Sequence, residues 1–173
     1  MTKQELLKQL KEFSEKALEG FLLPVRQQKE DTEPPKPRPP DVYMMRLTKS
    51  ESAQKVAPYI IHRIITGRDA QAPGEHETDA SAMVRSIFCV YNEDEQEGGL
   101  ALLGLMERFR IDLLEKVVIG KRFQIDLEAG LDTIIYPDDT GSYCIGEMIS
   151  TWIMPGVSRQ IYNERKELSW QKQ

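Results

Sequence analysis

A long amphipathic segment, residues 100–117, limits the possible folds of this chain more than any other feature. Its apolar residues recur at helical spacing and form one broad stripe: Leu102, Leu103, Met106, Phe109, Leu113, Leu114 and Val117. Such a stripe predicts a helix that packs along its length on another element, because water would otherwise cover it. Leu105 lies partly off the stripe, which indicates a second contact surface, and Gly120 predicts the end of the helix.

Strand-like segments lie on both sides of this helix. Residues 59–65 form a compact apolar run, and in residues 82–91 apolar and other side chains alternate between two faces. After the helix, KRFQIDL predicts a short extended piece, and residues 131–154 predict two strands around the turn sequence PDDTGS. Residues 66–81 are polar, rich in small residues and without periodicity, which predicts a long loop.

Both ends of the chain carry further segments. Residues 2–19 have apolar residues at helical spacing, and Thr2 with Glu5 is typical of a capping box, so we expect a docked amphipathic helix. Residues 33–40, EPPKPRPP, favour an extended polyproline spacer, and a ligand for a proline-recognition domain is the alternative. The C-terminal residues SRQIYNERKELSWQ predict a short helix.

This order of elements predicts an α+β fold. We expect an antiparallel sheet of about four strands packed against the long helix, with an N-terminal amphipathic helix and a C-terminal helical tail. The predicted organisation has four parts: an N-terminal helix (1–26), a proline-rich spacer (27–57), an α+β core (58–156) and a C-terminal arm (157–173).

Composition excludes several classes of function. The 173 residues are 40% hydrophobic, without a run long enough to cross a membrane, and the net charge of −5 argues against nucleic acid as the main partner. The two cysteines, Cys89 and Cys144, each lie in an apolar run, so we expect buried, reduced thiols. The two histidines give no recognisable zinc site.

The acidic stretch NEDEQE, residues 92–97, has two interpretations. Its carboxylates could bind Mg²⁺ or Ca²⁺, and a metal-dependent nuclease is the sharpest enzymatic hypothesis. However, the spacing does not match an EF-hand loop. Asn92 or Asp94 as a helix cap, with Glu95 or Glu97 completing a capping box, explains the same residues without a metal.

No nucleophilic site is indicated by the remaining residues. We expect His62, in YIIHRII, to lie on the wetter face of its strand, without a neighbouring Ser or Cys in a known pattern. We interpret Glu147 as a carboxylate at the rim of a strand, although a buried position with a raised pKa is the alternative. The sequence therefore predicts neither an enzyme nor a cofactor.

The order of a strand, VYNEDEQEG, LLGLMERFRIDLLEK and KRFQIDL resembles the tail-terminator (tail-completion) proteins of long-tailed bacteriophages and prophages. The closing strand YCIGEMISTWIMPG, with Gly146-Glu147 and Thr151-Trp152, is also similar. The resemblance covers roughly residues 80–156. The EPPKPRPP spacer, the 66–81 loop and the C-terminal residues depart from the pattern.

This resemblance implies a non-enzymatic structural protein of the virion. Such a subunit forms a homo-oligomeric ring, commonly a hexamer, that ends the tail tube at its head-proximal end and takes part in head–tail joining. The implied partners are the tail-tube protein, a neck or head-completion protein, the sheath of contractile tails, and DNA that passes through the lumen without specific binding. No membrane is implied, and assembly takes place in the host cytoplasm.

Several residues are candidates for assembly contacts or for the lumen of that ring: Glu93, Asp94, Arg108, Arg110, Asp138, Asp139 and Trp152. An acidic lumen would suit passing DNA because it offers the phosphates no cationic surface. Another ring of the head–tail connector, a stopper or neck protein, is the alternative structural hypothesis.

Overall fold

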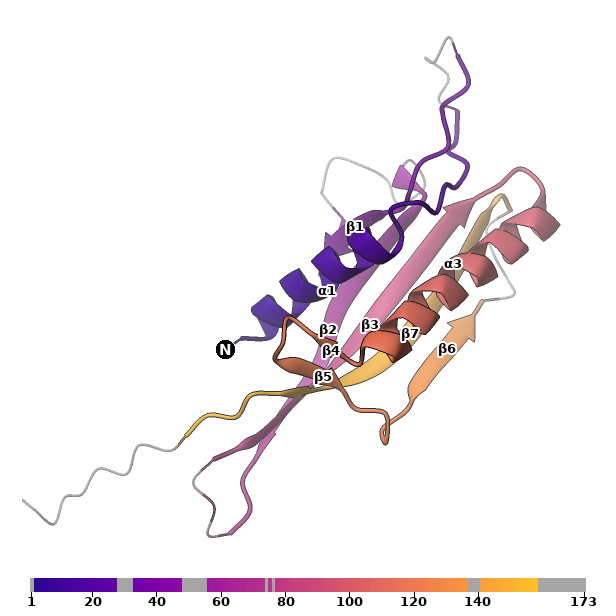
Figure 1. Ribbon diagram of the computed structural model, residues 1–173. Coiled ribbons are helices and arrows are strands. Elements are labelled where there is room, and N and C mark those ends of the chain that lie inside the picture. The colour runs from indigo at the N-terminus through magenta and orange to yellow at the C-terminus, as the bar shows by residue number, and fades with distance from the viewer. Residues whose placement is uncertain are drawn as a thin grey trace, which may run out of the picture.

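The computed structural model describes residues 2–27, 33–47, 56–73, 75, 77–136 and 141–158 (Figure 1). It contains two helices and seven strands in these residues: α1 (Lys3–Ala17), β1 (Asp41–Met44), β2 (Tyr59–Ala70), β3 (Asp79–Tyr91), α3 (Glu95–Lys116), β4 (Val118–Ile119), β5 (Phe123–Ile125), β6 (Leu131–Ile135) and β7 (Tyr143–Met154).

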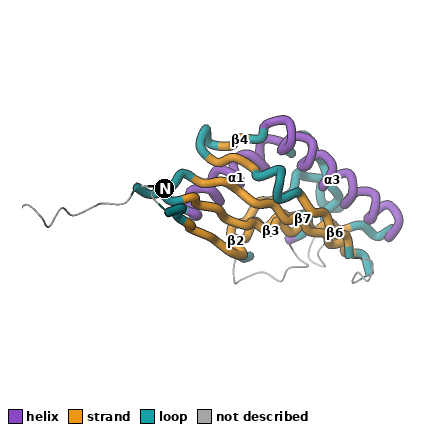
Figure 2. Tube along the Cα trace, turned by 90° about the horizontal axis from the view of Figure 1, so that it is seen from below, coloured by secondary structure: helices purple, strands orange, loops and turns teal. Residues whose placement is uncertain are grey.

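All seven strands belong to one curled, mixed sheet that forms a half-barrel. The order is β1-β2-β3-β7-β5-β4, and β6 also pairs with β7, beside β5. Figure 2 shows β2, β3, β7 and β6 side by side across this sheet. Strand β1 is parallel to β2, and the other pairs are antiparallel.

The predicted fold class is therefore wrong. The described part of the chain is mostly β, with about 40% strand and 28% helix, and its sheet is neither four-stranded nor purely antiparallel. Strands β1, β4 and β5 have four, two and three residues, which is too short for an alternating pattern to stand out in the sequence. The strand over residues 143–154 has the predicted bounds.

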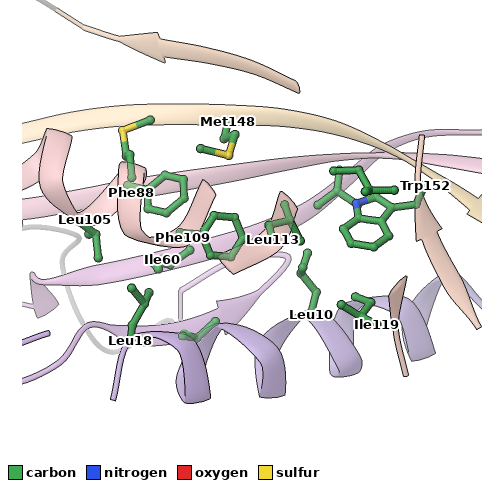
Figure 3. Close-up of a cluster of buried hydrophobic side chains, with 14 of the residues drawn as sticks. Leu10, Leu18, Ile60, Phe88, Leu105, Phe109, Leu113, Ile119, Met148 and Trp152 are labelled. Atoms are coloured by element: carbon green, nitrogen blue, oxygen red, sulfur yellow. The ribbon is translucent and has the colours of Figure 1, made fainter. Parts of the chain in front are cut away.

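The two helices lie on the same face of the sheet, α1 over β1 and β2 and α3 over β3 and β7 (Figure 1). Between the helices and the sheet lies the main hydrophobic core, part of which Figure 3 shows: Leu10, Leu18, Ile60, Phe88, Leu105, Phe109, Leu113, Ile119, Met148 and Trp152. The two predicted faces of the 82–91 strand are confirmed. Val84, Ser86 and Phe88 point toward the helices, and Arg85 and Ile87 point to the opposite face, called here the outer face.

The predicted stripe of the long helix needs one correction. Leu103 is 43% exposed, whereas Leu105 is fully buried in the core. The helix is covered by α1 as well as by β3 and β7, so its buried face is turned toward Leu105. It ends at Lys116, with Val117 as its C-cap at φ 55°, rather than at Gly120.

The predicted loop at residues 66–81 is mostly a β-hairpin. Strand β2 continues to Ala70 and β3 begins at Asp79, so the two strands form an arm that projects beyond the helix layer (Figure 1). Its residues show no alternation because β2 is exposed on both faces from Thr66 to Asp69, and neither face needs apolar side chains.

The described part of the C-terminal region follows the same arm. Thr78 N–H donates to Val157 O at 3.3 Å, and Val157 N–H donates to Thr78 Oγ1 at 3.0 Å. A Cβ on Gly156 would collide with the Thr78 carbonyl, so glycine allows this close approach. The predicted C-terminal helix lies outside the described residues.

The proline-rich segment is attached to the body where it is described. Arg38 and Leu23 exchange two backbone hydrogen bonds of 2.9 and 3.0 Å. The Arg38 guanidinium donates to Val56 O at 2.9 Å and pairs with Asp41 at 2.7 Å. The N-terminal helix shares its core with the 58–156 region, because Leu6, Leu10 and Leu18 belong to the main core.

Candidate assembly surfaces

The acidic junction before α3 is a helix start. Asp94 is the N-cap, and its carboxylate accepts hydrogen bonds from Gln96 N–H at 2.9 Å and Glu97 N–H at 3.1 Å. The Asn92 side chain accepts from Asp94 N–H at 3.1 Å, and Glu93 is exposed. Within the described residues, no group of three or more His, Cys, Asp or Glu side chains is placed to hold a metal ion.

The capping interpretation gives a testable difference between two neighbouring acids. Replacing Asp94 with alanine should lower the free energy of unfolding by about 1 kcal/mol, because two N–H groups of α3 lose their acceptor. Replacing Glu93, which among the described residues accepts only a long bond from the Tyr91 hydroxyl, should change this free energy by less than about 0.5 kcal/mol. Urea unfolding measures both, and equal effects of the two substitutions would contradict the assignment of Asp94 as the cap.

The other candidate assembly residues lie apart from the acidic junction. Arg108 pairs with Asp112 at 3.4 Å, and Arg110 makes two hydrogen bonds to Glu107 at 3.0 and 2.7 Å, so both arginines are bound within α3. Trp152 is fully buried, and its Nε1–H donates to Ser150 Oγ at 2.9 Å. Trp152 is therefore a core residue and cannot contact another subunit. Asp138 and Asp139 lie outside the described residues.

His62 is completely buried between α1 and the sheet, which corrects the expected position on the wetter face. Ser14 donates its hydroxyl proton to Leu10 O at 2.7 Å, so its oxygen accepts from His62 Nε2 at 2.8 Å. Nδ1 of the neutral ring then accepts from the Ser86 hydroxyl at 2.8 Å. Burial lowers the pKa of His62 to about 3, so the ring is neutral at pH 7. Through these two hydrogen bonds His62, in β2, links α1 and β3.

Glu147 lies on the outer face and is also buried, with its side chain 6% exposed, so the expected rim position is wrong. Arg85, on the neighbouring strand, donates from Nε to Glu147 and from Nη2 to the Tyr136 hydroxyl at 3.3 Å. The bond to Glu147 raises the pKa of Arg85. Arg63 lies directly opposite Arg85 on β2, so two cations share this region with one carboxylate.

Removing the cation from this pair should destabilise the protein more than removing both charges. The Arg85→Met variant leaves the buried Glu147 carboxylate without its main partner and should lose about 1–3 kcal/mol of unfolding free energy. The double variant Arg85→Met/Glu147→Met should recover most of that loss, because no uncompensated charge remains. Thermal unfolding of both variants measures this. A double variant that is no more stable than Arg85→Met would argue against the pair.

The two sides of the sheet end in unpaired backbone. Strand β6 and the following Tyr136, called here the β6 margin (residues 131–136), pair with β7 on one side only within the described residues. Apolar side chains stay exposed on both faces of this margin: Ile134 (39%), Ile135 (44%) and Tyr136 (37%). Native proteins seldom leave a flat apolar edge strand uncovered, because it pairs readily with other chains.

The opposite side is the β2 margin (residues 63–70). Strand β1 pairs with β2 only from Tyr59 to His62, and no described strand continues along the same side of β2 beyond it. Arg63 Nε is buried in this margin and has no described hydrogen-bond acceptor. Sequence reasoning missed both margins. The two-sided apolar run TIIY, which a half-buried strand would not need, was the available signal.

No protein-family model and no curated protein matches this sequence with significance. In the described residues, neither helix is long and apolar enough to cross a membrane.

Proposed function

We propose that this protein is a non-enzymatic ring subunit of a bacteriophage or prophage virion, the tail terminator that ends the tail tube. The observation that carries the proposal is the pair of different unpaired margins on opposite sides of one sheet. An interface between two different surfaces of the same subunit is head-to-tail and generates a ring when the rotation closes. The resemblance in element order that the sequence of residues 80–156 has to tail terminators makes a hexamer the closed form that we propose.

Other features of the structure suit an assembly part. The β2–β3 arm projects beyond the body, and the segment after β7 follows it, so both can reach a neighbouring subunit (Figure 1). The proposed partners are the tail-tube protein on one rim and a neck or head-completion protein on the other. In contractile tails the sheath is a third partner.

We further propose that the acidic residues Glu93 and Asp94 border a lumen through which DNA passes without specific binding. Both residues lie at the start of α3, where Glu93 is exposed. Like charges on a channel wall would prevent the phosphates from adhering to it.

Binding to isolated phage parts tests the proposal. The full chain is mixed separately with purified tails that lack a terminator and with DNA-filled heads, and the particles are examined by electron microscopy. We expect rings on the head-proximal end of the tails and none on the heads. Rings on filled heads would favour a stopper or neck protein instead, and binding to neither particle would contradict a place in the head–tail connection.

A further inference from the structure

We infer that the β6 margin of one copy adds as an antiparallel strand to the β2 margin of the next copy, with Asp132 of the added strand beside Arg68 of the receiving strand. This inference rests on the proposed ring, because it specifies the joint between neighbouring subunits. Four observations carry it: the free backbone of β6, the open edge of β2, the strand directions and the charges.

The β6 margin offers free hydrogen-bonding groups. Tyr136 N–H donates to Ile145 O of β7, and hydrogen-bonded and non-hydrogen-bonded residue pairs alternate along β6 from there. Asp132 and Ile134 therefore also bond to β7, whereas the N–H and C=O groups of Thr133 and Ile135 point away from the sheet. An added strand would satisfy these four groups and would cover the apolar side chains of the margin.

The β2 margin is an edge that can receive a strand. It continues for eight residues beyond the end of β1, from Arg63 to Ala70. Ile65, at an irregularity of the β2–β3 pairing, is 47% exposed. The buried Arg63 Nε donor lacks an acceptor in the described residues, which is the kind of deficit that a polar group from another chain corrects.

The strand directions fit this joint. Strand β2 is antiparallel to β3, β3 is antiparallel to β7, and β7 is antiparallel to β6. Strand β6 is thus antiparallel to β2 of its own chain. Rotation about the ring axis gives the strands of every copy the same inclination to that axis, so β6 meets the neighbouring β2 in the antiparallel sense. Within one chain Asp132 is level with Arg63, through Ile149 and Arg85, so placing Asp132 beside Arg68 of the next copy requires strands that tilt against the axis, as in closed barrels.

The charges fix which side chains meet. Arg63 and Arg68 both point to the outer face. Arg63 lies opposite Arg85 of β3 and Arg68 lies opposite Ser81, so the two arginines are four positions apart along the ladder. The irregularity near Ile65 accounts for the one extra residue between them in β2. Asp132 and Tyr136 of β6 lie on the same face and are also four positions apart. Antiparallel addition therefore places Tyr136 near Arg63 when Asp132 is near Arg68. Neither Arg68 nor Asp132 has an ion-pair partner in the described part of its own chain.

Charge reversal tests the pairing. Assembly of the full chain is followed by analytical ultracentrifugation over a concentration series, alone and with isolated tail tubes. Arg68→Glu alone, and Asp132→Arg alone, should each raise the concentration for half-assembly by at least about tenfold, because like charges then face each other. An equimolar mixture of the two variants should assemble at the wild-type concentration, since each joint of an alternating ring then unites opposite charges. The double variant should also assemble normally.

A matched control and a backbone variant complete the test. Lys8→Glu makes the same charge change at an exposed position of α1 and should leave assembly unchanged. Thr133→Pro removes an N–H group that points away from β7, so the protomer should keep its circular-dichroism spectrum but fail to assemble.

Three results would overturn the inference while the proposed function stands, provided that the wild type forms rings. They are normal assembly of Arg68→Glu or of Thr133→Pro, and failure of the equimolar mixture to regain assembly. A dimer in which β6 pairs with β6 of a second copy would show normal assembly of Arg68→Glu, because Arg68 takes no part in that joint. A wild type that forms no ring at any concentration, alone or on tubes, would overturn both the joint and the proposed function.

Discussion

Replacement of Phe109 with alanine is expected to lower the free energy of unfolding by about 3–5 kcal/mol. The Phe109 ring is fully buried at the centre of the core and joins the two helices to the sheet (Figure 3). Its centroid lies 5.9 Å from Phe13 of α1, 5.5 Å from Phe88 of β3 and 5.9 Å from the His62 ring of β2. Truncation leaves a cavity lined from three directions, which the fixed strands cannot close.

Urea unfolding of Phe109→Ala measures this loss, and Leu103→Ala is the matched control. Leu103 lies on the same helix with 43% of its surface exposed, so its truncation should cost less than about 1 kcal/mol. Similar losses in the two variants would contradict the packing described for α3, because the stripe would then include Leu103 as fully as Phe109.

Acidification is expected to destabilise the protein through His62, by about 3 kcal/mol between pH 6.5 and pH 4. The ordinary pKa of histidine is 6.5, and burial lowers that of His62 to about 3. Between these two values the unfolded chain binds a proton that the folded chain does not. The stabilising contribution is therefore complete above pH 6.5 and is lost as the pH falls toward 3, at about 1.4 kcal/mol per pH unit.

The His62→Phe variant isolates this effect from the carboxylates, which also titrate in acid. The phenyl ring keeps the shape of the site but cannot bind a proton, and it leaves the Ser86 hydroxyl without its acceptor. We expect a less stable protein at pH 7 whose unfolding free energy falls less steeply below pH 6.5 than that of the wild type. Parallel pH profiles of the two proteins, from urea unfolding at each pH, would show that His62 is not buried in the neutral form.

The sequence predicted those elements that bury one face and expose the other. The two helices, the alternating strand at 82–91 and the strand at 143–154 all had such patterns, and α1 begins at the predicted Thr2 cap. The acidic junction was also correctly interpreted as a helix start, because Asp94 lies where capping chemistry requires it.

The rest of the fold depends on pairings that local sequence does not encode. Strand β1 has only four residues and exists because β2 lies beside it, with Asp41 opposite Tyr59. The hairpin arm is made of residues exposed on both faces, which look like loop residues when taken alone. Local sequence favours wet surfaces for His62 and Glu147, because the partners that accompany their burial, Ser14 and Arg85, are 48 and 62 residues away in the chain.

The same distinction between local patterns and long-range pairings applies to the candidate assembly residues. The cap role of Asp94 follows from a local motif, and its place in an assembly stays a prediction. Trp152, a candidate from the family resemblance, lies in the core. The margins at β2 and β6 became visible only when the strand order showed which edges have no neighbour. A five-residue edge strand and a central strand have similar sequences, and only the sheet distinguishes them.

The mass of the assembled protein in solution tests the central proposal most directly. Light scattering coupled to size-exclusion chromatography, with the full chain alone and after release from tail tubes, gives the mass relative to the 19.9 kDa protomer. We expect one closed species of about six protomers that electron microscopy shows as a ring. A protein that stays monomeric in the presence of tubes, or that forms filaments of indefinite length, would contradict it.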